Sequence, residues 1–270
     1  MTPPPVKERA LAAGVPILQP ARLRDPGWPE RLRDVRADVA VVVAFGQILP
    51  RAVLDAPARG SINVHASLLP RYRGAAPIAW AIMRGETETG ITTFQMEEGM
   101  DTGPMLLREA VSVAPDETAG ELSTRLAIVG ARVLMDTLDR LDALIPTPQA
   151  HAEATLAPRL KKSDGYLDWN RPAPELVNVV RGCNPWPGAT TRTPLGNLTI
   201  WRAAVLERGA ESARTLEPGA LGEHGRTLAI GTGAHPLLPL EVQPENRRSI
   251  AWADYLRGAR LGPGVRFTSP

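Results

Sequence analysis

The sequence predicts an α/β protein, in which a doubly wound, Rossmann-like sheet domain is followed by a small β-barrel domain. Short apolar runs alternate with helical stretches through the first half of the chain, as they do in strand–helix units. Residues 38–45 form a near-continuous apolar run that ends in a turn at Gly46, which is typical of a parallel strand covered on both faces. Further along, short β-like runs separated by Gly and Pro favour a small barrel.

The first half contains most of the helical signal. Strands are expected at 38–45, 61–65 and 89–96, a shorter apolar run lies at 15–18, and helices are expected at 6–13, 50–55, 76–84 and 117–144. The last helix follows an Asp-Glu pair, and acidic residues are favourable at a helix N-terminus. An apolar stripe at helical spacing runs along it, formed by Leu122, Leu126, Val129, Val133, Leu138 and Leu141.

A Pro-containing stretch at 145–148 marks the change between the two halves. We therefore assign residues 1–150 to the first domain, 151–160 to a linker and 161–270 to the second domain. In the second domain, helices are expected at 174–181 and 250–256 and β-like runs at 190–193, 197–201, 226–230 and 237–242.

Composition excludes several classes of protein. The chain has 270 residues, 43% of them hydrophobic and 22% charged, which excludes a wholly disordered or fibrous protein. A lone cysteine, Cys183, excludes an intrachain disulfide framework and a Cys-rich zinc site. No apolar run is long enough to span a membrane and the first residues lack the apolar core of a secretory leader, so we expect a cytoplasmic protein.

Charge is distributed unevenly between the halves. Residues 1–150 carry 16 Lys and Arg against 18 Asp and Glu, whereas residues 151–270 carry 15 against 11. A basic second half favours an anionic partner, and ordinary scatter accounts for the difference equally well.

The candidate catalytic side chains lie between residues 61 and 103. Asn63 and His65 are two residues apart at the end of an expected strand, so their side chains share one face at the sheet edge where ligands bind in open α/β folds. An amide donor and an imidazole together can stabilise a developing oxyanion. Asp101, in a Gly-containing turn after the next expected strand, is the candidate for orienting or charging His65. Taken alone, Asn63 and His65 are better explained as groups that cap a strand end.

A resemblance to a known family adds to this interpretation. Residues 63–78 and 101–103 resemble the signature of folate-dependent formyltransferases, and residues 44–50, 161–169 and 184–189 resemble further blocks of the branch that formylates methionyl-tRNA. The resemblance implies transfer of the formyl group of 10-formyltetrahydrofolate to the α-amino group of methionine on initiator tRNA. It assigns oxyanion binding to Asn63 and His65, and assigns Asp101 to keeping His65 protonated or passing protons through a water. No metal is implied, and the sequence offers no cluster of His and Cys ligands.

The resemblance also implies binding residues. Folate contacts fall on the loop Ser67, Leu68, Leu69 and Pro70 and on Phe45, Gln47, Ile48 and Leu49, with the turn at 96–100. Contacts with tRNA fall on Arg71, Arg73, Lys161, Lys162, Arg247 and Arg248, with the glutamate tail of the folate as the alternative partner of Arg71 and Arg73. The second domain is expected to be an OB-like barrel that helps hold the tRNA. Exposed arginines are more often only solvated, so the arginine assignments depend most on the resemblance.

Two alternatives remain open. One is a formyltransferase that acts on another amine, such as a UDP-amino sugar or glycinamide ribonucleotide, or a hydrolase of the formyl group. The other is a non-catalytic folate- or RNA-binding module, which the presence of all of Asn63, His65 and Asp101 disfavours.

The start of the sequence also departs from the resembled family. The first strand, helix, second strand and basic loop of that family have no counterpart here, and without them a strand at 38–45 would gain an unpaired edge. We therefore expect this chain to be a truncated or mis-started form of a longer enzyme. It should be poorly stable or self-associating, and its activity on tRNA should be weak. The full-length protein is expected to be a monomer.

Overall fold

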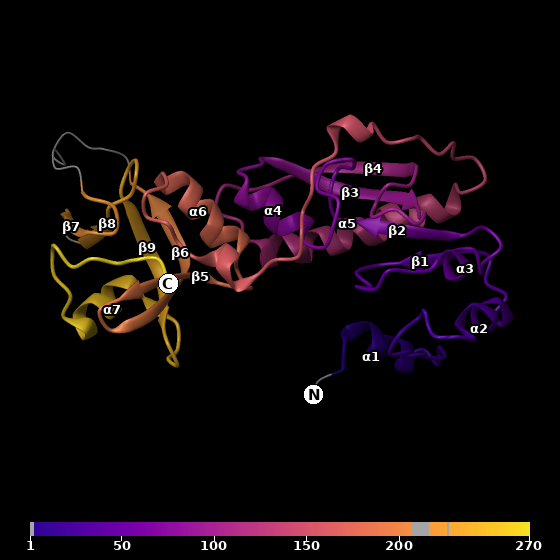
Figure 1. Ribbon diagram of the computed structural model, residues 1–270, viewed down its shortest axis with the longest axis horizontal. Coiled ribbons are helices and arrows are strands. Elements are labelled where there is room, and N and C mark those ends of the chain that lie inside the picture. The colour runs from indigo at the N-terminus through magenta and orange to yellow at the C-terminus, as the bar shows by residue number, and fades with distance from the viewer. Residues whose placement is uncertain (1–2, 207–215, 226) are drawn as a thin grey trace.

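The computed structural model describes residues 3–206, 216–225 and 227–270, which form two sheet-centred parts placed end to end (Figure 1). The first part is built on a four-stranded sheet and the second on a six-stranded sheet. Among the helices described, none combines the length and the apolar character needed to cross a membrane.

The first sheet is mixed. Its strands are β1 (Ala40–Val42), β2 (Ser61–His65), β3 (Glu88–Gln95) and β4 (Met105–Ser112), in the order β1-β2-β3-β4. β1 and β2 are parallel, whereas β3 pairs antiparallel with both β2 and β4. The predicted α/β fold and the strands at 61–65 and 89–96 are confirmed, but the sheet is not parallel throughout, and β4 was not anticipated.

The prediction for residues 38–45 is confirmed in part. A strand forms there and pairs parallel with β2, and in the described part of the chain it lies at an unpaired edge as expected, but it is shorter than predicted and is not covered on both faces. β1 is only three residues long and pairs with β2 alone among the described residues. Val41, Val43 and Phe45 are at least 40% exposed. The apolar run lies at the edge of the sheet, where α1 (Pro5–Ala12) and α2 (Trp28–Asp34) contribute no buried side chains (Figure 1). An apolar sequence is covered on both faces only where other elements supply the cover.

The longest helix fixes the sheet that carries the candidate site. α5 (Ala119–Asp139) is shorter than the predicted helix and begins at Thr118, whose side chain and that of Glu121 form a reciprocal capping box. Its apolar stripe packs on β2, β3 and β4, with Leu122, Leu126 and Val133 in the core. The helices α3 (Arg51–Leu54) and α4 (Pro77–Met83) agree with the helices predicted at 50–55 and 76–84. The apolar run at 15–18 forms no strand.

The second part is an antiparallel sheet with helices. After the short 3-10 turns η1 (His151–Glu153) and η2 (Lys162–Gly165) come α6 (Ala173–Gly182), β5 (Ala189–Thr193), β6 (Gly196–Val205), β7 (Leu221–His224), β8 (Thr227–Ile230), β9 (Leu237–Pro244), β10 (Ile250–Ala251) and α7 (Trp252–Ala259). Residue 226, at the start of the run predicted at 226–230, lies outside the described residues.

This second sheet is open in the described part of the chain. The strand order is β5-β6-β9-β8-β7, with β10 on β9. The expected OB-like barrel is not confirmed, because the described residues of β5 and β7 do not pair with each other. The described C-terminal segment lies between these edges: it bridges to β5 at Arg192–Thr268, and it contacts the other edge through the bridge Ala220–Arg266 and through backbone hydrogen bonds with Leu221.

The two parts are connected by the chain and also contact each other directly, partly through polar groups. α6 packs against α4, and the buried Arg181 of α6 donates to the backbone oxygens of Ala114 and Pro115 in front of α5. Arg202 of β6 pairs with Glu121 of α5. The division into 1–150, 151–160 and 161–270 stays a prediction.

Candidate active site

β2 carries two polar side chains at its C-terminal end, Asn63 and His65. Asn63 and His65 lie two residues apart on this strand and so project from the same face. Nε2 of His65 lies 2.9 Å from the backbone oxygen of Tyr72. Because a carbonyl oxygen only accepts hydrogen bonds, Nε2 must carry a hydrogen. The Asn63 amide makes no side-chain hydrogen bond within the described part of the chain, so its N–H groups remain available to a ligand.

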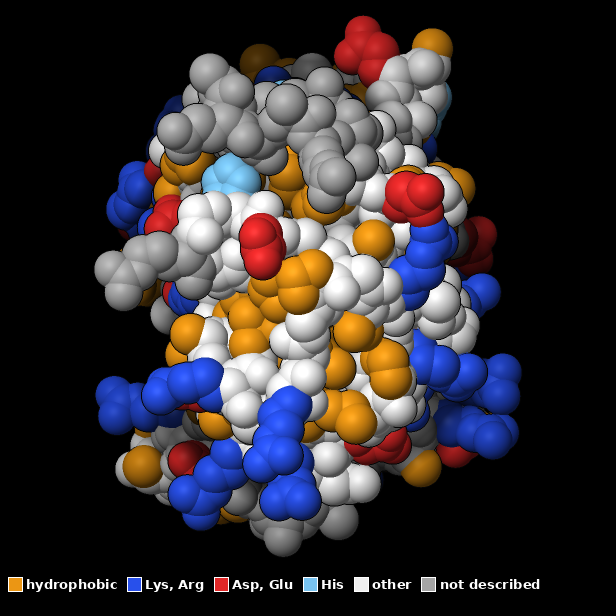
Figure 2. All heavy atoms as spheres, turned by 90° about the vertical axis from the view of Figure 1, so that its left-hand side faces the viewer, with side chains coloured by type: hydrophobic (Ala, Val, Ile, Leu, Met, Phe, Trp, Pro, Cys, Tyr) orange, Lys and Arg blue, Asp and Glu red, His pale blue; other side chains and the backbone are white. Residues whose placement is uncertain are grey.

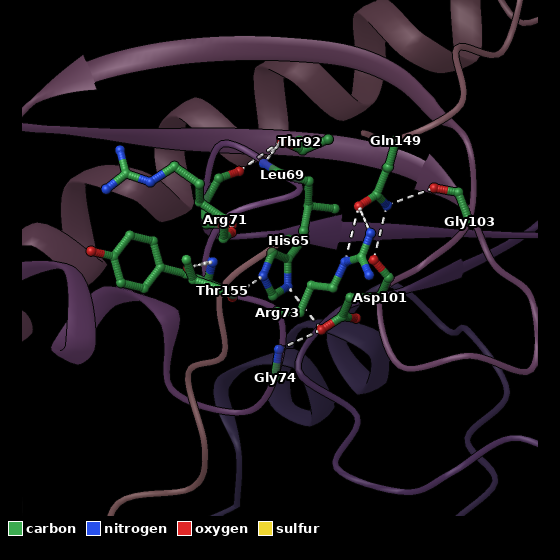
Figure 3. Close-up of polar contacts among 12 residues, drawn as sticks. His65, Leu69, Arg71, Arg73, Gly74, Thr92, Asp101, Gly103, Gln149 and Thr155 are labelled. Atoms are coloured by element: carbon green, nitrogen blue, oxygen red, sulfur yellow. Dashed lines mark hydrogen bonds and ion pairs between the residues drawn. The ribbon is translucent and has the colours of Figure 1, made fainter. Parts of the chain in front are cut away.

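Asp101 faces the other nitrogen of the same ring. Its Oδ2 lies 3.7 Å from Nδ1 of His65, in the turn between β3 and β4 (Figure 3). This distance is too long for a hydrogen bond but short enough for an ion pair. Since Nε2 faces the Tyr72 oxygen, Nδ1 is the ring nitrogen that faces the carboxylate. The structure therefore brings together the histidine and the aspartate that the sequence proposed as partners.

Both ring nitrogens of His65 face groups of the protein in this arrangement. The ring is 6% exposed and packs edge-on against Phe94 at a centroid distance of 6.5 Å. For His65 to donate to an oxyanion, Nε2 must exchange its contact with the Tyr72 oxygen for the substrate. Asn63 needs no such exchange, so it is the better preorganised donor of the two.

The loop at 67–70 is fixed to the sheet through its backbone. Thr92 of β3 donates its hydroxyl to Ser67 O over 2.7 Å and accepts from Leu69 N over 3.2 Å. Arg108 of β4 donates to Leu69 O over 2.9 Å. The side chains of Ser67, Leu69 and Pro70 are buried, and Leu68 is half-buried. The structure thus makes this loop a rigid wall, whose candidate folate contacts come from its backbone and from Leu68.

The second predicted folate segment is more open. Phe45 is 43% exposed and Ile48 is 91% exposed, whereas Leu49 is buried in a small cluster with Val53 and Leu54. The Gln47 side chain accepts from Leu23 N and donates to Ala21 O, so it holds the preceding loop. Phe45 and Ile48 therefore remain available to a ligand, while Leu49 is a core residue.

The two arginines that follow the loop behave differently. Arg71 is exposed, pairs with Glu86 and lies over the Tyr72 ring. Burial and a hydrogen bond to Glu86 raise the pKa of Tyr72 to about 12, so this hydroxyl stays protonated and donates. Arg73 is only 7% exposed, which argues against its predicted contact with RNA. The other candidates for RNA, Lys161, Lys162, Arg247 and Arg248, are all exposed.

A buried glutamine that sequence reasoning missed completes the cluster. Oε1 of Gln149 accepts from Nε and Nη2 of Arg73 at 3.1 and 2.6 Å (Figure 3). Its Nε2 donates to Asp101 O at 2.9 Å and to Gly103 O at 2.7 Å. Gln149 follows Asp101 by 48 residues in a segment interpreted as polar connection, so no local signal identifies it.

A mixed α/β sheet that carries Asn63 and His65 at the end of β2, with Asp101 beside His65, is the arrangement expected of a group-transfer enzyme. Family models described as formyl transferase and formyl transferase C-terminal domain match residues 3–138 and 159–260. The chain belongs to the formyl transferase family, in its methionyl-tRNA formyltransferase branch.

Curated relatives place the chain within that branch. Methionyl-tRNA formyltransferase of Geobacter metallireducens is 45% identical over 99% of this chain and 85% of its own length. The enzyme of that name from Symbiobacterium thermophilum is 47% identical over 100% of this chain and 83% of its own length.

Solved structures share the fold at low identity. WlaRD, a sugar 3N-formyl transferase, has a TM-score of 0.64 at 16% identity and aligns over 90% of this chain and 82% of its own. HypX from Aquifex aeolicus, solved with tetrahydrofolic acid, has a TM-score of 0.61 at 18% identity and aligns over 84% of this chain and 40% of its own.

Proposed function

We propose that this chain transfers the formyl group of 10-formyltetrahydrofolate to the α-amino group of methionyl initiator tRNA, for the start of translation. The observation that carries the proposal is the His65–Asp101 pair, 3.7 Å apart, with Asn63 on the same strand as His65. Curated relatives at 45 to 47% identity are named for this reaction.

The chemistry follows from what these side chains can do. The amine of the acceptor adds to the formyl carbon, and the formyl oxygen gains negative charge that the Asn63 amide is placed to stabilise. The adding nitrogen loses a proton, and the leaving nitrogen of the donor gains one. The His65–Asp101 pair is the group in the site suited to exchange that proton, directly or through a water.

The formyl donor supplies an activated one-carbon group and a flat ring system. The rigid loop at 67–70 and the exposed side chains of Phe45 and Ile48 fit such a ligand, because a pterin is an apolar plane with an amide-like edge that backbone groups match. Solved structures with this fold contain tetrahydrofolic or folinic acid, which supports a folate donor here. The residues that would hold it are Leu68, Phe45 and Ile48, with the backbone of Ser67, Leu69 and Pro70.

The second part supplies the candidate RNA surface. Lys161 and Lys162 begin the segment that enters it, and Arg247 and Arg248 lie in the turn between β9 and β10. Figure 2 shows Lys and Arg side chains around an apolar centre on the outer face of this part. We propose that these four residues contact phosphates, and that the antiparallel sheet presents them without needing to close into a barrel.

A formylation assay tests the function. Purified protein, 10-formyltetrahydrofolate and methionyl initiator tRNA should yield formylmethionyl-tRNA, and omission of the folate should abolish it. The second candidate acceptor is a nucleotide-linked amino sugar, which the sugar formyltransferases of similar fold favour. Formylation of the sugar but not of the tRNA would support that alternative and overturn the proposal.

A further inference from the structure

The segment that leaves α5 returns along the candidate site before it enters the second part. We call residues 147–157 the strap. Thr147 exchanges two backbone hydrogen bonds of 2.8 Å with Met105 at the start of β4. Further along, Arg73 N donates to Thr155 O over 2.9 Å and Ala157 N donates to Arg73 O over 2.7 Å. The strap therefore contacts both chain segments that flank His65 and Asp101.

Gln149 is the buried polar side chain of this strap. It is 5% exposed, and both amide hydrogens and the amide oxygen are engaged. Its two donated bonds end on the backbone oxygens of Asp101 and Gly103, within the turn that carries the Asp101 carboxylate (Figure 3). Its oxygen is held by Arg73, whose guanidinium also reaches Nδ1 of His151 at 3.1 Å.

The Asp101 turn needs such support. Asp101 has φ +54, a left-handed conformation that is uncommon for a residue with a side chain and persists when the surroundings over-determine it. The carboxylate accepts a 2.7 Å hydrogen bond from Gly74 N, which aims Oδ2 at the same corner as His65. If the turn relaxes, the carboxylate loses both the Gly74 amide and its approach to Nδ1.

We propose that Gln149 is a positioning residue for the formyl transfer, which holds the Asp101 turn so that the carboxylate faces His65, and that Arg73 orients Gln149 for this purpose. The proposal rests on the proposed function. It assigns to the strap a part in the reaction, although no atom of Gln149 is expected to touch the reacting groups.

The Gln149→Glu variant distinguishes the hydrogen bonds that Gln149 accepts from Arg73 from those that it donates to the Asp101 turn. A carboxylate keeps an acceptor for Arg73, and the buried guanidinium remains paired. It cannot donate to Asp101 O or Gly103 O. Thr147→Ala is the matched control, because Thr147 is an exposed strap residue whose contacts with Met105 are through the backbone.

The first measurement is the single-turnover rate of formyl transfer, with the affinity for the folate measured separately. A misplacement of about 1 Å in a positioned group costs about 100-fold in rate. We expect Gln149→Glu to lower the rate about 10- to 100-fold with folate affinity unchanged, and Thr147→Ala to change neither. In an Asp101→Asn background, Gln149→Glu should change the rate by less than about 2-fold, because the group it positions is already disabled. A rate equal to that of the wild type, or effects that multiply in the double variant, would overturn the proposal.

The second measurement does not depend on activity. In protein labelled with ¹⁵N-glycine, the Gly74 amide should exchange faster with solvent in Gln149→Glu than in the wild type or in Thr147→Ala, because its acceptor on Asp101 has moved. Unchanged Gly74 exchange would contradict the positioning role even if the rate fell. A wild-type protein without formyl transfer would instead overturn the proposed function, and the exchange measurement would still decide whether Gln149 holds the turn.

Discussion

Asp101 and Tyr72 hold the two nitrogens of the His65 ring from opposite sides. The Tyr72 oxygen lies 2.9 Å from Nε2, and the Asp101 carboxylate lies 3.7 Å from Nδ1. The first contact fixes a hydrogen on Nε2, so any proton gained by the ring must enter on the side of Asp101. In the proposed reaction, a proton exchanged by the ring would therefore pass through Nδ1, which faces Asp101.

Removing either partner should disable the chemistry. His65→Ala and Asp101→Asn should each lower the single-turnover rate by orders of magnitude and leave folate binding broadly intact. The loss of one oxyanion donor costs about 2.7–4 kcal/mol, so a comparable loss is expected for Asn63→Ala. Quenched-flow formylation assays and folate titrations measure the two quantities. Near-wild-type rates in any of the three variants would show that its side chain has another role.

Charge reversal on the second part should weaken tRNA binding. Lys161→Glu, Lys162→Glu, Arg247→Glu and Arg248→Glu should each flatten the dependence of affinity on salt, by about one unit of slope for each phosphate that the protein no longer neutralises. Arg9→Glu is the control, because Arg9 is an exposed cation on α1, away from the second part (Figure 1). Filter binding over a range of salt concentrations measures the slope. If all four variants bound like the wild type at low salt, the RNA surface would lie elsewhere.

The capping box of α5 should make stability depend on pH. Hydrogen bonds from the backbone and hydroxyl of Thr118, and then the contact with Arg202, lower the pKa of Glu121 to about 2. Because the pKa of Glu121 is lower in the folded state than its ordinary value of 4.5, this carboxylate stabilises the protein above that pH, and the contribution is lost as the pH falls toward 2.

Glu121→Gln keeps the shape of the box without the charge. Its melting temperature should be below that of the wild type at about pH 6, and the difference should shrink as the pH falls through the range between the two pKa values. Thermal unfolding followed by circular dichroism is sufficient. A difference that stayed constant over that range would mean that the carboxylate charge contributes nothing to the cap.

Arg181 should stabilise the junction between the two parts. Its guanidinium donates to the oxygens of Ala114 and Pro115, although burial lowers its pKa and Nε has no partner among the described residues. Arg181→Met should cost about 1–3 kcal/mol, because it removes two hydrogen bonds from a charged donor to the backbone oxygens of Ala114 and Pro115. Arg171→Met, at an exposed arginine just before α6, should change stability by less than about 0.5 kcal/mol. Equal unfolding free energies for the two variants would show that Arg181 does not stabilise the junction.

The sequence by itself determined the elements whose signals are local. The strands at 61–65 and 89–96 and the apolar stripe of α5 follow from side-chain spacing, which acts over a few residues. The placement of Asn63, His65 and Asp101 was also predictable, because strand geometry puts the first two on one face and a short turn brings the third beside His65. Their chemistry stays a prediction.

Only the tertiary structure decided which surfaces are covered and which distant groups meet. The run at 38–45 has the composition of a buried strand, yet its exposure depends on neighbours that the run does not encode. The same holds for the open sheet of the second part, where the described residues of β5 and β7 form separate edges. Gln149 reaches Asp101 across 48 residues, because the strap folds back over the site and a buried amide must find partners for all its polar atoms. Such contacts arise from packing between segments, which spacing along the chain does not specify.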